Sequence, residues 1–265
     1  EKEIFFDGMP PEALMEKAGI QISYWLLKRK HLLKHGIVVL IGPGHNGGDG
    51  AVIARELFLK GCLVKVWCPF PIKKKLTIDH VNYLTSIGVT KLADPPEING
   101  KELWIDAVFG NNQTRKVDNK LIKLLNQKFH NKYGKVLSID VPTGLCPDKG
   151  EPFLYSAVKA NYTLAIGLNK IGLIQDSALP FIGELHHIDI GIPIDKLSKI
   201  EKKIFKVTYS DLKNIGLPSL QKNFNKYKRG RTLIIAGSDK YPGAAYLALK
   251  GALSSGAGFI SAVLP

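Results

Sequence analysis

The sequence is poor in cysteine and has no long apolar run. Its three cysteines, Cys62, Cys68 and Cys146, are widely spaced and form no CxxC or Cys/His pattern. This argues against a disulfide scaffold or a zinc site, and it predicts reduced thiols in a cytoplasmic protein. No apolar stretch approaches the roughly 18 residues that a membrane span needs, so we expect a soluble protein with no membrane partner.

Acidic residues are also scarce. The 265 residues include 37 Lys and Arg against 23 Asp and Glu, which gives a formal net charge of +14. Such a surplus is compatible with an anionic partner such as RNA. The lysines are scattered over expected helix faces and loops, however, and no RNA-binding motif accompanies them. We therefore favour a solvated basic surface without a nucleic-acid partner. The sequence is compatible with a homo-oligomer.

Short apolar segments with strand character alternate with segments of helical periodicity along most of the chain. The expected strands span residues 36–42, 62–68, 102–110, 135–140, 162–167 and 183–191. The expected helices span residues 10–34, 48–60, 76–88 and 117–130. This alternation predicts an α/β fold in which helices cover both faces of a doubly wound, Rossmann-like parallel sheet.

The composition changes near residue 207 and suggests two domains. We assign residues 1–207 to the first domain, 208–230 to a linker, and 231–265 to the start of a second domain. The last segment has the pattern strand, glycine-rich turn, helix, strand, which is a single βαβ unit. A lone βαβ unit leaves sheet faces and edges without partners, so we expect it to open a larger α/β domain. Because the sequence begins without Met, we also expect residue 1 not to be the biological start.

The stretch "GPGHNG" (42–47) matches the GxGxxG pattern of dinucleotide-binding proteins, between an expected strand and an expected helix. Two features disfavour an ordinary dehydrogenase. No acidic residue follows strand 62–68 to bind a ribose, and Asp49 lies in the turn, where its charge would repel a pyrophosphate. A Walker A loop is excluded, because no Gly-Lys-Ser/Thr follows. A tight turn with Asp49 as the helix cap remains an alternative.

Polar residues follow two further strands at the point where each strand ends. Asp106 lies in the strand before "GNNQTRK", and Asp140 ends the strand before "VPTG". Ligands of open α/β sheets bind outside the carboxyl ends of the strands, so we expect the three strand-end loops to meet in one crevice. That crevice would bring together Asn46, Asp49, Asp106 and Asp140.

Carboxylates that crowd together are unfavourable unless they are protonated, hydrogen-bonded or paired with a cation. A hard cation bound by oxygen atoms is one solution. Arg115 or Lys116 could offset the charge or bind a ligand phosphate. Simpler alternatives stay open: Asp106 could cap nearby backbone N–H groups, and the two basic residues could be solvated loop charges.

Five stretches, taken together and in order, resemble the NAD(P)H-hydrate epimerase family. They are "LMEKAG" (14–19), "GPGHNGGDGAVIAREL" (42–57), "IDAVFG" (105–110), "SIDVPTG" (138–144) and "LNKIGL" (168–173). The resemblance implies a repair enzyme, an isomerase that interconverts the R and S epimers of hydrated NADH and NADPH. These damaged cofactors carry a hydroxyl group on C6 of the nicotinamide ring.

The resemblance also implies roles for individual residues. Asp140 would be the catalytic acid/base, and Asn46, Asp106 and Thr143 would hold a potassium ion. The residues implied in binding the hydrated nucleotide are His45, Asn46, Gly47, Gly48, Asp49, Gly110, Asn111, Asn112, Gln113, Thr114, Arg115, Lys116 and Asp140. The family usually has Asn in place of His45 and Ser in place of Thr143. Lys170 matches a family lysine, and we leave its role open.

The segment after Gly230 resembles the start of the ADP- or ATP-dependent NAD(P)H-hydrate dehydratase, a ribokinase-like domain. This implies a bifunctional repair protein in which ADP or ATP serves only the dehydratase, a lyase whose remaining segments are absent here. We therefore expect the chain to epimerise but not to dehydrate. A non-catalytic scaffold that binds RNA or protein with the same fold is the alternative. The intact set of strand-end polar residues favours the enzyme.

Overall fold

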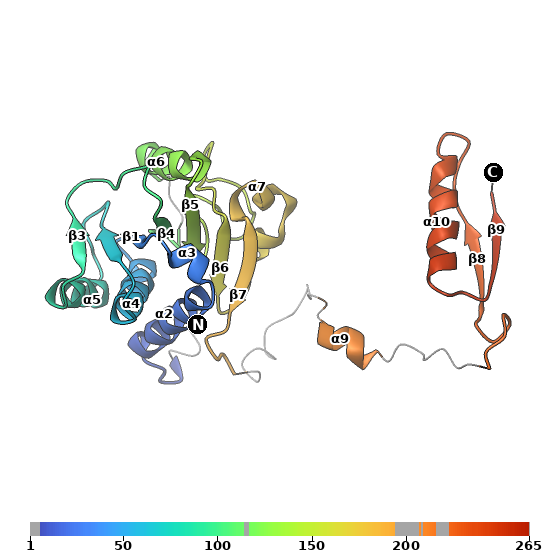
Figure 1. The fold of residues 1–265 in the computed structure, drawn as a ribbon, viewed down its shortest axis with the longest axis horizontal. Helices are drawn as coiled ribbons and strands as arrows, with labels where there is room; N and C mark the ends of the chain where they lie inside the picture. Colours follow the sequence, from blue (N-terminus) through green and yellow to red (C-terminus); the bar gives the residue numbers. More distant parts are fainter. Residues whose placement is uncertain (1–5, 114–116, 194–206, 208, 216–222, 265) are drawn as a thin grey trace. The chain divides into compact units, whose positions relative to one another are not determined.

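The computed structural model describes residues 6–113, 117–193, 207, 209–215 and 223–264. The chain divides into two compact units, Glu1–Glu201 and Lys202–Pro265. Figure 1 draws both units, and each is described by itself below. No helix in the described part of the chain combines the length and apolar character that a membrane span requires.

The first unit is built on a seven-stranded sheet in the order β3-β2-β1-β4-β5-β6-β7, with every pair parallel (Figure 1). The strands are β1 Ile37–Ile41, β2 Val64–Trp67, β3 Thr90–Leu92, β4 Leu103–Ala107, β5 Lys135–Ile139, β6 Tyr162–Ile166 and β7 Glu184–Ile188. The predicted doubly wound α/β fold is confirmed. The sequence did not reveal β3, because this short edge strand is mostly exposed and lacks an apolar run.

The main helices of this unit are α2 Pro11–Leu27, α3 Lys30–Leu33, α4 His45–Leu59, α5 Lys75–Ser86, α6 Asn119–His130 and α7 Leu179–Ile182. The prediction of one continuous helix over residues 10–34 is wrong. The side chain of Arg29 donates to the carbonyl oxygen of Trp25 (3.1 Å), and its guanidinium lies 3.7 Å from the centroid of that indole ring. This carbonyl would otherwise accept the helical bond from the N–H of residue 29, so α2 ends just before it.

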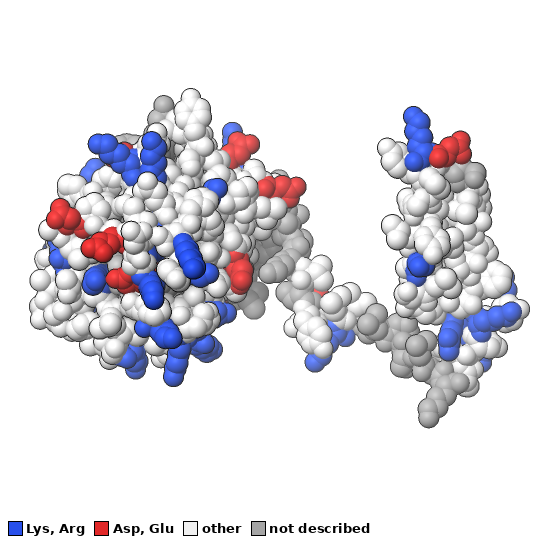
Figure 2. All heavy atoms as spheres, turned by 45° about the horizontal axis from the view of Figure 1, so that its top comes forward, with Lys and Arg blue, Asp and Glu red and all other residues white. Residues whose placement is uncertain are grey.

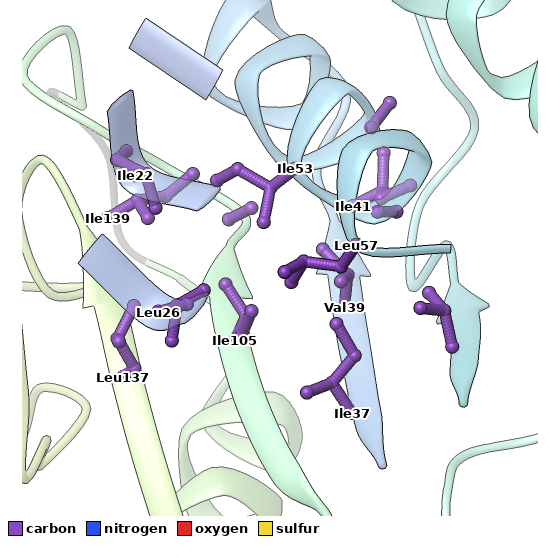
Figure 3. Close-up of a cluster of buried hydrophobic side chains, with 14 of the residues drawn as sticks. Ile22, Leu26, Ile37, Val39, Ile41, Ile53, Leu57, Ile105, Leu137 and Ile139 are labelled. Atoms are coloured by element: carbon purple, nitrogen blue, oxygen red, sulfur yellow. The ribbon is translucent and has the colours of Figure 1, made fainter. Parts of the chain in front are cut away.

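The two faces of the sheet have separate cores, because alternate residues of a strand point to opposite faces. Residues of β1 divide in this way: Ile37, Val39 and Ile41 pack with α2 and α4, whereas Val38 and Leu40 pack with α6. Figure 3 shows the first core, where Ile22 and Leu26 of α2 and Ile53 and Leu57 of α4 meet β1, β4 and β5. A strand that is buried on both faces reads as a continuous apolar run, which explains the sequence pattern.

The motif "LMEKAG" fastens α2 to α4. Both nitrogens of the Arg55 guanidinium fork bind the two oxygens of Glu16, at 2.7 and 2.5 Å. A Cβ atom on Gly19 would lie 2.6 Å from the Cβ atom of Val52, so the two helices approach closely at that point. This motif therefore acts on packing, and it fixes the helix whose first turn reaches the functional site.

The second unit contains the predicted βαβ pattern: β8 Arg231–Ile235, α10 Pro242–Ser254 and β9 Phe259–Val263, with β8 parallel to β9. Several of its large apolar side chains are exposed to solvent. Leu233, Ile235, Leu247 and Leu253 are each more than half exposed. Two strands and one helix cannot enclose a core, so this unit has the form of a fragment of a larger α/β domain.

Candidate active site

A cavity of about 430 Å³ opens at the carboxyl ends of the central strands. Its wall comes from residues 43–46 and Asp49, from Lys74, from residues 108–113, and from Asp140 and Ile166. Adjacent strands β1, β4 and β5 bring the three predicted loops together, as the expected strand order requires. The crevice predicted at this edge of the sheet is therefore present.

Eight of the thirteen predicted binding residues lie in the cavity wall: His45, Asn46, Asp49, Gly110, Asn111, Asn112, Gln113 and Asp140. Gly47 and Gly48 are buried outside it. Thr114, Arg115 and Lys116 lie outside the described residues, so the predicted phosphate contact of this part of the loop stays a prediction. Asp106 and Thr143 lie below the cavity, and each is fully buried.

The glycines of the loop after β1 allow other segments to pack closely against it. A Cβ atom on Gly42 would collide with the backbone of Val108, and one on Gly47 would collide with the carbonyl oxygen of Gly42. A Cβ atom on Gly48 would lie 2.5 Å from the sulfur of Met15. These glycines therefore bring the loop after β1 against the loop after β4 and against α2, and so shape the cavity wall.

The first turn of α4 lies in the cavity wall, where it contributes His45 and Asn46. The helix begins at His45, earlier than the sequence suggested, and Gly44 is its N-cap without a side-chain cap bond. Asp49 lies inside the helix, so the alternative that it caps the helix is wrong. Uncapped N–H groups and the helix dipole favour an anionic ligand group at this position.

Asp106 is a buried carboxylate whose two oxygens are saturated by neutral donors. Oδ1 accepts bonds from the Thr143 hydroxyl (2.7 Å) and the Val108 N–H (3.3 Å). Oδ2 accepts bonds from the Thr143 N–H (2.9 Å) and the Ser138 hydroxyl (3.0 Å). Burial raises the pKa of Asp106, and these bonds oppose that rise. The carboxylate thus ties the end of β4 to the loop after β5.

This position corrects the expectation that three carboxylates share the mouth of the crevice. Asp49 and Asp140 line the cavity, but Asp106 has no exposed surface. In the described part of the chain, no three His, Cys, Asp or Glu side chains form a metal-binding group. The alternative that Asp106 caps backbone N–H groups describes its present bonds, although two of its donors are hydroxyl groups.

Asp140 follows β5 in a strained backbone conformation. Its φ of +65° makes it the one residue other than glycine with positive φ among those described. The N–H of Val141 donates to the carbonyl of Ile139 (2.9 Å), so Asp140 is the centre of a three-residue turn. Its own N–H donates to Leu164 of β6 (2.8 Å). Such strain persists where the surroundings fix it, and it collects at functional sites.

The carboxylate of Asp140 is held from two sides. The ammonium of Lys170 donates to Oδ1, and the N–H of Asn111 donates to Oδ2 (2.8 Å). Lys170 also donates to the carbonyl oxygen of Ile166 (2.7 Å), the last residue of β6. The two side chains of the ion pair are 12–13% exposed. Asp140 is therefore paired with a positive charge from the protein itself, which the sequence argument did not anticipate.

Gln113 braces the cavity instead of offering its amide to a ligand. Its Nε2 donates to the carbonyl of Pro142 (3.1 Å), and its Oε1 accepts from the N–H of Gly144 (2.7 Å). Both ends of the side chain are thus used to join the loop after β4 to the loop after β5. Its predicted contact with the nucleotide stays a prediction, now with a backbone group as the available contact.

Asn46 and Gly110 mark a space for a ligand or ion. Within the described residues, the Asn46 Nδ2 atom is buried without a hydrogen-bond partner. A Cβ atom on Gly110 would lie 2.9 Å from Asn46 Oδ1 and 2.9 Å from Asp140 Oδ2. Glycine at position 110 therefore keeps open the space beside an amide and a carboxylate, in the wall of the cavity.

The sequence argument did not place two cationic residues at the site: it left the role of Lys170 open and did not single out Lys74. Lys74 lines the cavity just before α5, and Lys170 lies behind Asp140. Lys74 belongs to the run "KKK" (73–75), which gives no sign of which lysine faces the site. Lys170 was visible as part of "LNKIGL", but its contacts with Asp140 and with the carbonyl oxygen of Ile166 were not. Only the tertiary structure places Lys74 in the cavity wall and Lys170 beside Asp140.

Comparison with known proteins bears on this site. The family described as YjeF-related protein N-terminus matches residues 11–172. The chain belongs to this family. The matched region contains every strand-end loop of the cavity and Lys170. The family membership predicted from the five sequence motifs is thereby confirmed.

Curated relatives agree with this assignment. A protein of Oenococcus oeni named NAD(P)H-hydrate epimerase is 31% identical over 70% of this chain and 88% of its own length. A protein of Synechocystis named bifunctional NAD(P)H-hydrate repair enzyme Nnr is 37% identical over the whole chain, but over only 51% of its own length. The chain thus spans about half the length of the bifunctional relatives that it matches.

The fold also has a solved neighbour. The crystal structure of yeast ynu0 covers 77% of this chain with a TM-score of 0.60 and 22% sequence identity. At that identity the likeness concerns the fold alone. It agrees with the seven-stranded parallel sheet of the first unit.

Proposed function

We propose that the first unit epimerises hydrated NADH and NADPH at C6 of the nicotinamide ring. The observation that carries the proposal is the cavity wall itself, in which a strained, lysine-paired Asp140 faces a space kept open by Gly110. The relatives named as NAD(P)H-hydrate epimerases support the choice of substrate. Residues with a strained backbone that line a cavity are typical of functional sites.

The reaction needs one group that exchanges a proton with the C6 hydroxyl. In its protonated form Asp140 donates to the hydroxyl oxygen while the C6–O bond breaks, and the lone pair of the ring nitrogen forms a C6–N double bond. Water leaves and can return to the other face of the ring. The Asp140 carboxylate then takes the proton of the incoming water, and the lone pair returns to nitrogen. A positioned acid/base contributes roughly 10²–10⁴-fold to such a step.

The phosphates of the substrate need positive charge and N–H donors. The uncapped first turn of α4 and the side chain of Lys74 supply these on the wall of the cavity. Arg115 and Lys116 belong to the same loop as the cavity residues 108–113 and would add to this charge. The ring would then lie toward Asp140 and Ile166, and the phosphates toward α4 and α5.

We also propose a potassium ion near Asp106. The carboxylate of Asp106 has no ion pair within the described residues. Asn46, Asp106 and Thr143 would supply oxygen atoms, which a hard cation prefers. When bound, the ion would offset negative charge beside the cavity. Because neutral donors already surround Asp106, the ion would share its oxygens with them.

The activity can be tested with the purified chain. The R hydrate of NADH is supplied with a separate dehydratase that accepts only the S hydrate and with its nucleotide, and recovery of NADH absorbance is followed. We expect recovery to accelerate in proportion to added protein. Recovery at the rate of the protein-free mixture would refute the proposal, and RNA binding at physiological salt would then support the scaffold alternative.

We further propose that the parent protein is bifunctional, with 231–265 opening a dehydratase domain. The uncovered apolar faces of the second unit and the bifunctional relatives that align with the whole chain support this. The chain alone should therefore leave the S hydrate unchanged when ADP or ATP is present. Conversion of the S hydrate by this chain would contradict the proposal.

A further inference from the structure

The ion pair of Asp140 and Lys170 has a role that stability does not explain. The two side chains are 12–13% exposed, so both charges lose most of their hydration. Removing two charges from water costs about as much as their attraction returns, and apolar replacements of such pairs are often neutral or stabilising. A pair of this kind next to a cavity is better explained by what it does to Asp140 than by fold stability.

Lys170 controls which carboxylate oxygen faces the cavity. It binds Oδ1, while Oδ2 accepts from the N–H of Asn111 and lies beside the space that a side chain at position 110 would fill. Asn111 and Gly110 are both in the cavity wall. Rotation of the carboxylate would break two charge-assisted bonds, one at each oxygen. The oxygen that reaches the reacting hydroxyl is therefore fixed before the substrate arrives.

The position of Lys170 is itself fixed by the backbone. Gly167, directly after β6, has a positive φ (+70°), and the carbonyl oxygen of Ile166 accepts a second bond from the ammonium (2.7 Å). The N–H of Leu173 donates to the carbonyl of Lys170 (3.0 Å), which begins the short 3₁₀ segment Ile171–Ile174. The ammonium thus has two fixed partners, the carbonyl of β6 and the carboxylate after β5.

We propose that Lys170 is a positioning residue for the epimerisation, one that holds the side chain of Asp140 with Oδ2 turned to the substrate. It acts through Asp140 and does not line the cavity. Together with the strained turn at Asp140, it aims the acid/base at one point of the ring. The proposal rests on the epimerase function proposed above, and its test separates the two.

The test compares Lys170→Met and Lys170→Arg with the native chain in the coupled epimerase assay. We expect Lys170→Met to lower kcat by roughly 100-fold while KM changes less than about twofold, because substrate contacts remain. Lys170→Arg keeps the charge and should retain roughly a tenth of the native kcat. Lys149→Met, which removes an exposed lysine of the preceding loop, is the matched control and should be unchanged.

Chemical rescue separates a lost charge from a damaged fold. Lys170→Cys treated with 2-bromoethylamine regains a side chain of lysine length and charge, and kcat should recover at least tenfold. Treatment with iodoacetamide gives a neutral side chain and should not restore it. The native chain treated with each reagent controls for Cys62, Cys68 and Cys146, which are free thiols.

Each outcome has one meaning. An inactive native chain would refute the epimerase function. An active native chain with a native kcat in Lys170→Met would refute only the role of Lys170. A loss in Lys170→Met that appears as raised KM, or as a lowered Tm that aminoethylation does not correct, would also overturn that role, because both indicate binding or folding rather than positioning.

Discussion

The ends of β4 and β5 carry one aspartate each, on adjacent strands, yet the fold gives the two side chains opposite surroundings. Asp106 is 0% exposed, sits within a regular strand and accepts only neutral donors. Asp140 is 8% exposed, follows its strand in a left-handed conformation and is paired with an ammonium. The same residue type thus joins two loops in one place and lines the cavity in the other.

The difference is the reason why we propose Asp140, and not Asp106, as the acid/base. The oxygens of Asp106 already accept four hydrogen bonds and have no exposed surface, whereas Asp140 keeps Oδ2 at the cavity wall with a single backbone donor. Backbone strain is tolerated at Asp140 because three hydrogen-bonded neighbours hold it there. Burial and partner charge, rather than residue identity, therefore divide the roles.

Asp140→Asn is the most direct test of the acid/base role proposed for Asp140. Asparagine tolerates positive φ and keeps the shape of the side chain, but it cannot exchange the proton. We expect kcat to fall about 10²–10⁴-fold with substrate binding changed by only a few-fold, measured in the coupled assay and by calorimetry. Asp148→Asn, an exposed acid in the same loop region, should behave as native. A native rate in Asp140→Asn would remove it from the catalytic role.

Asp106→Asn tests the other half of the comparison. The amide nitrogen cannot accept the two bonds that one carboxylate oxygen now receives, so donors of Ser138 or Thr143 lose a buried partner. The free energy of unfolding should fall by about 3 kcal/mol in a denaturant titration. Asp118→Asn is the matched control, since asparagine caps α6 as well as aspartate does. Equal stability of the two variants would show that Asp106 does not hold the end of β4 to the loop after β5.

Potassium should act on the Asp106 side of the site. If Asn46, Asp106 and Thr143 hold the ion, KCl at about 100 times its Kd should stabilise the native chain by about 2.7 kcal/mol relative to choline chloride at equal ionic strength. The same comparison in Asp106→Asn should show little difference. A stabilisation that persists undiminished in this variant would place the ion elsewhere.

Lys74→Ala should have the smallest effect and should separate binding from chemistry. Its charge lies in the cavity wall away from the ion pair, so we expect KM to rise about tenfold, about 1.4 kcal/mol, with kcat unchanged. Lys73→Ala is the matched control, because Lys73 is an exposed neighbour outside the wall. A fall in kcat without a change in KM would assign Lys74 to the chemistry instead.

The basic surface offers a last contrast with the site. Figure 2 shows Lys and Arg spread over the face in view, with Asp and Glu among them. The ammonium of Lys170, by contrast, has two defined partners, Asp140 and the carbonyl oxygen of Ile166. This distribution agrees with a solvated surface, as the scattered lysines of the sequence suggested.

Local patterns predicted much of this protein. Continuous apolar runs marked the buried strands, and polar residues after β1, β4 and β5 marked one edge of the sheet, because parallel strands place their carboxyl ends together. The motifs located Asp106 and Asp140. They could not rank the two, since both appear as an aspartate near the end of an apolar run.

The sequence by itself determined the α/β class, the sheet edge that carries the site and the family. Only the tertiary structure decided the depth of Asp106, the left-handed turn at Asp140, and the arrival of Lys74 and Lys170. The physical reason is that strand patterns are encoded by near neighbours with a fixed period. Burial and charge pairing depend on segments that meet only after the chain has folded.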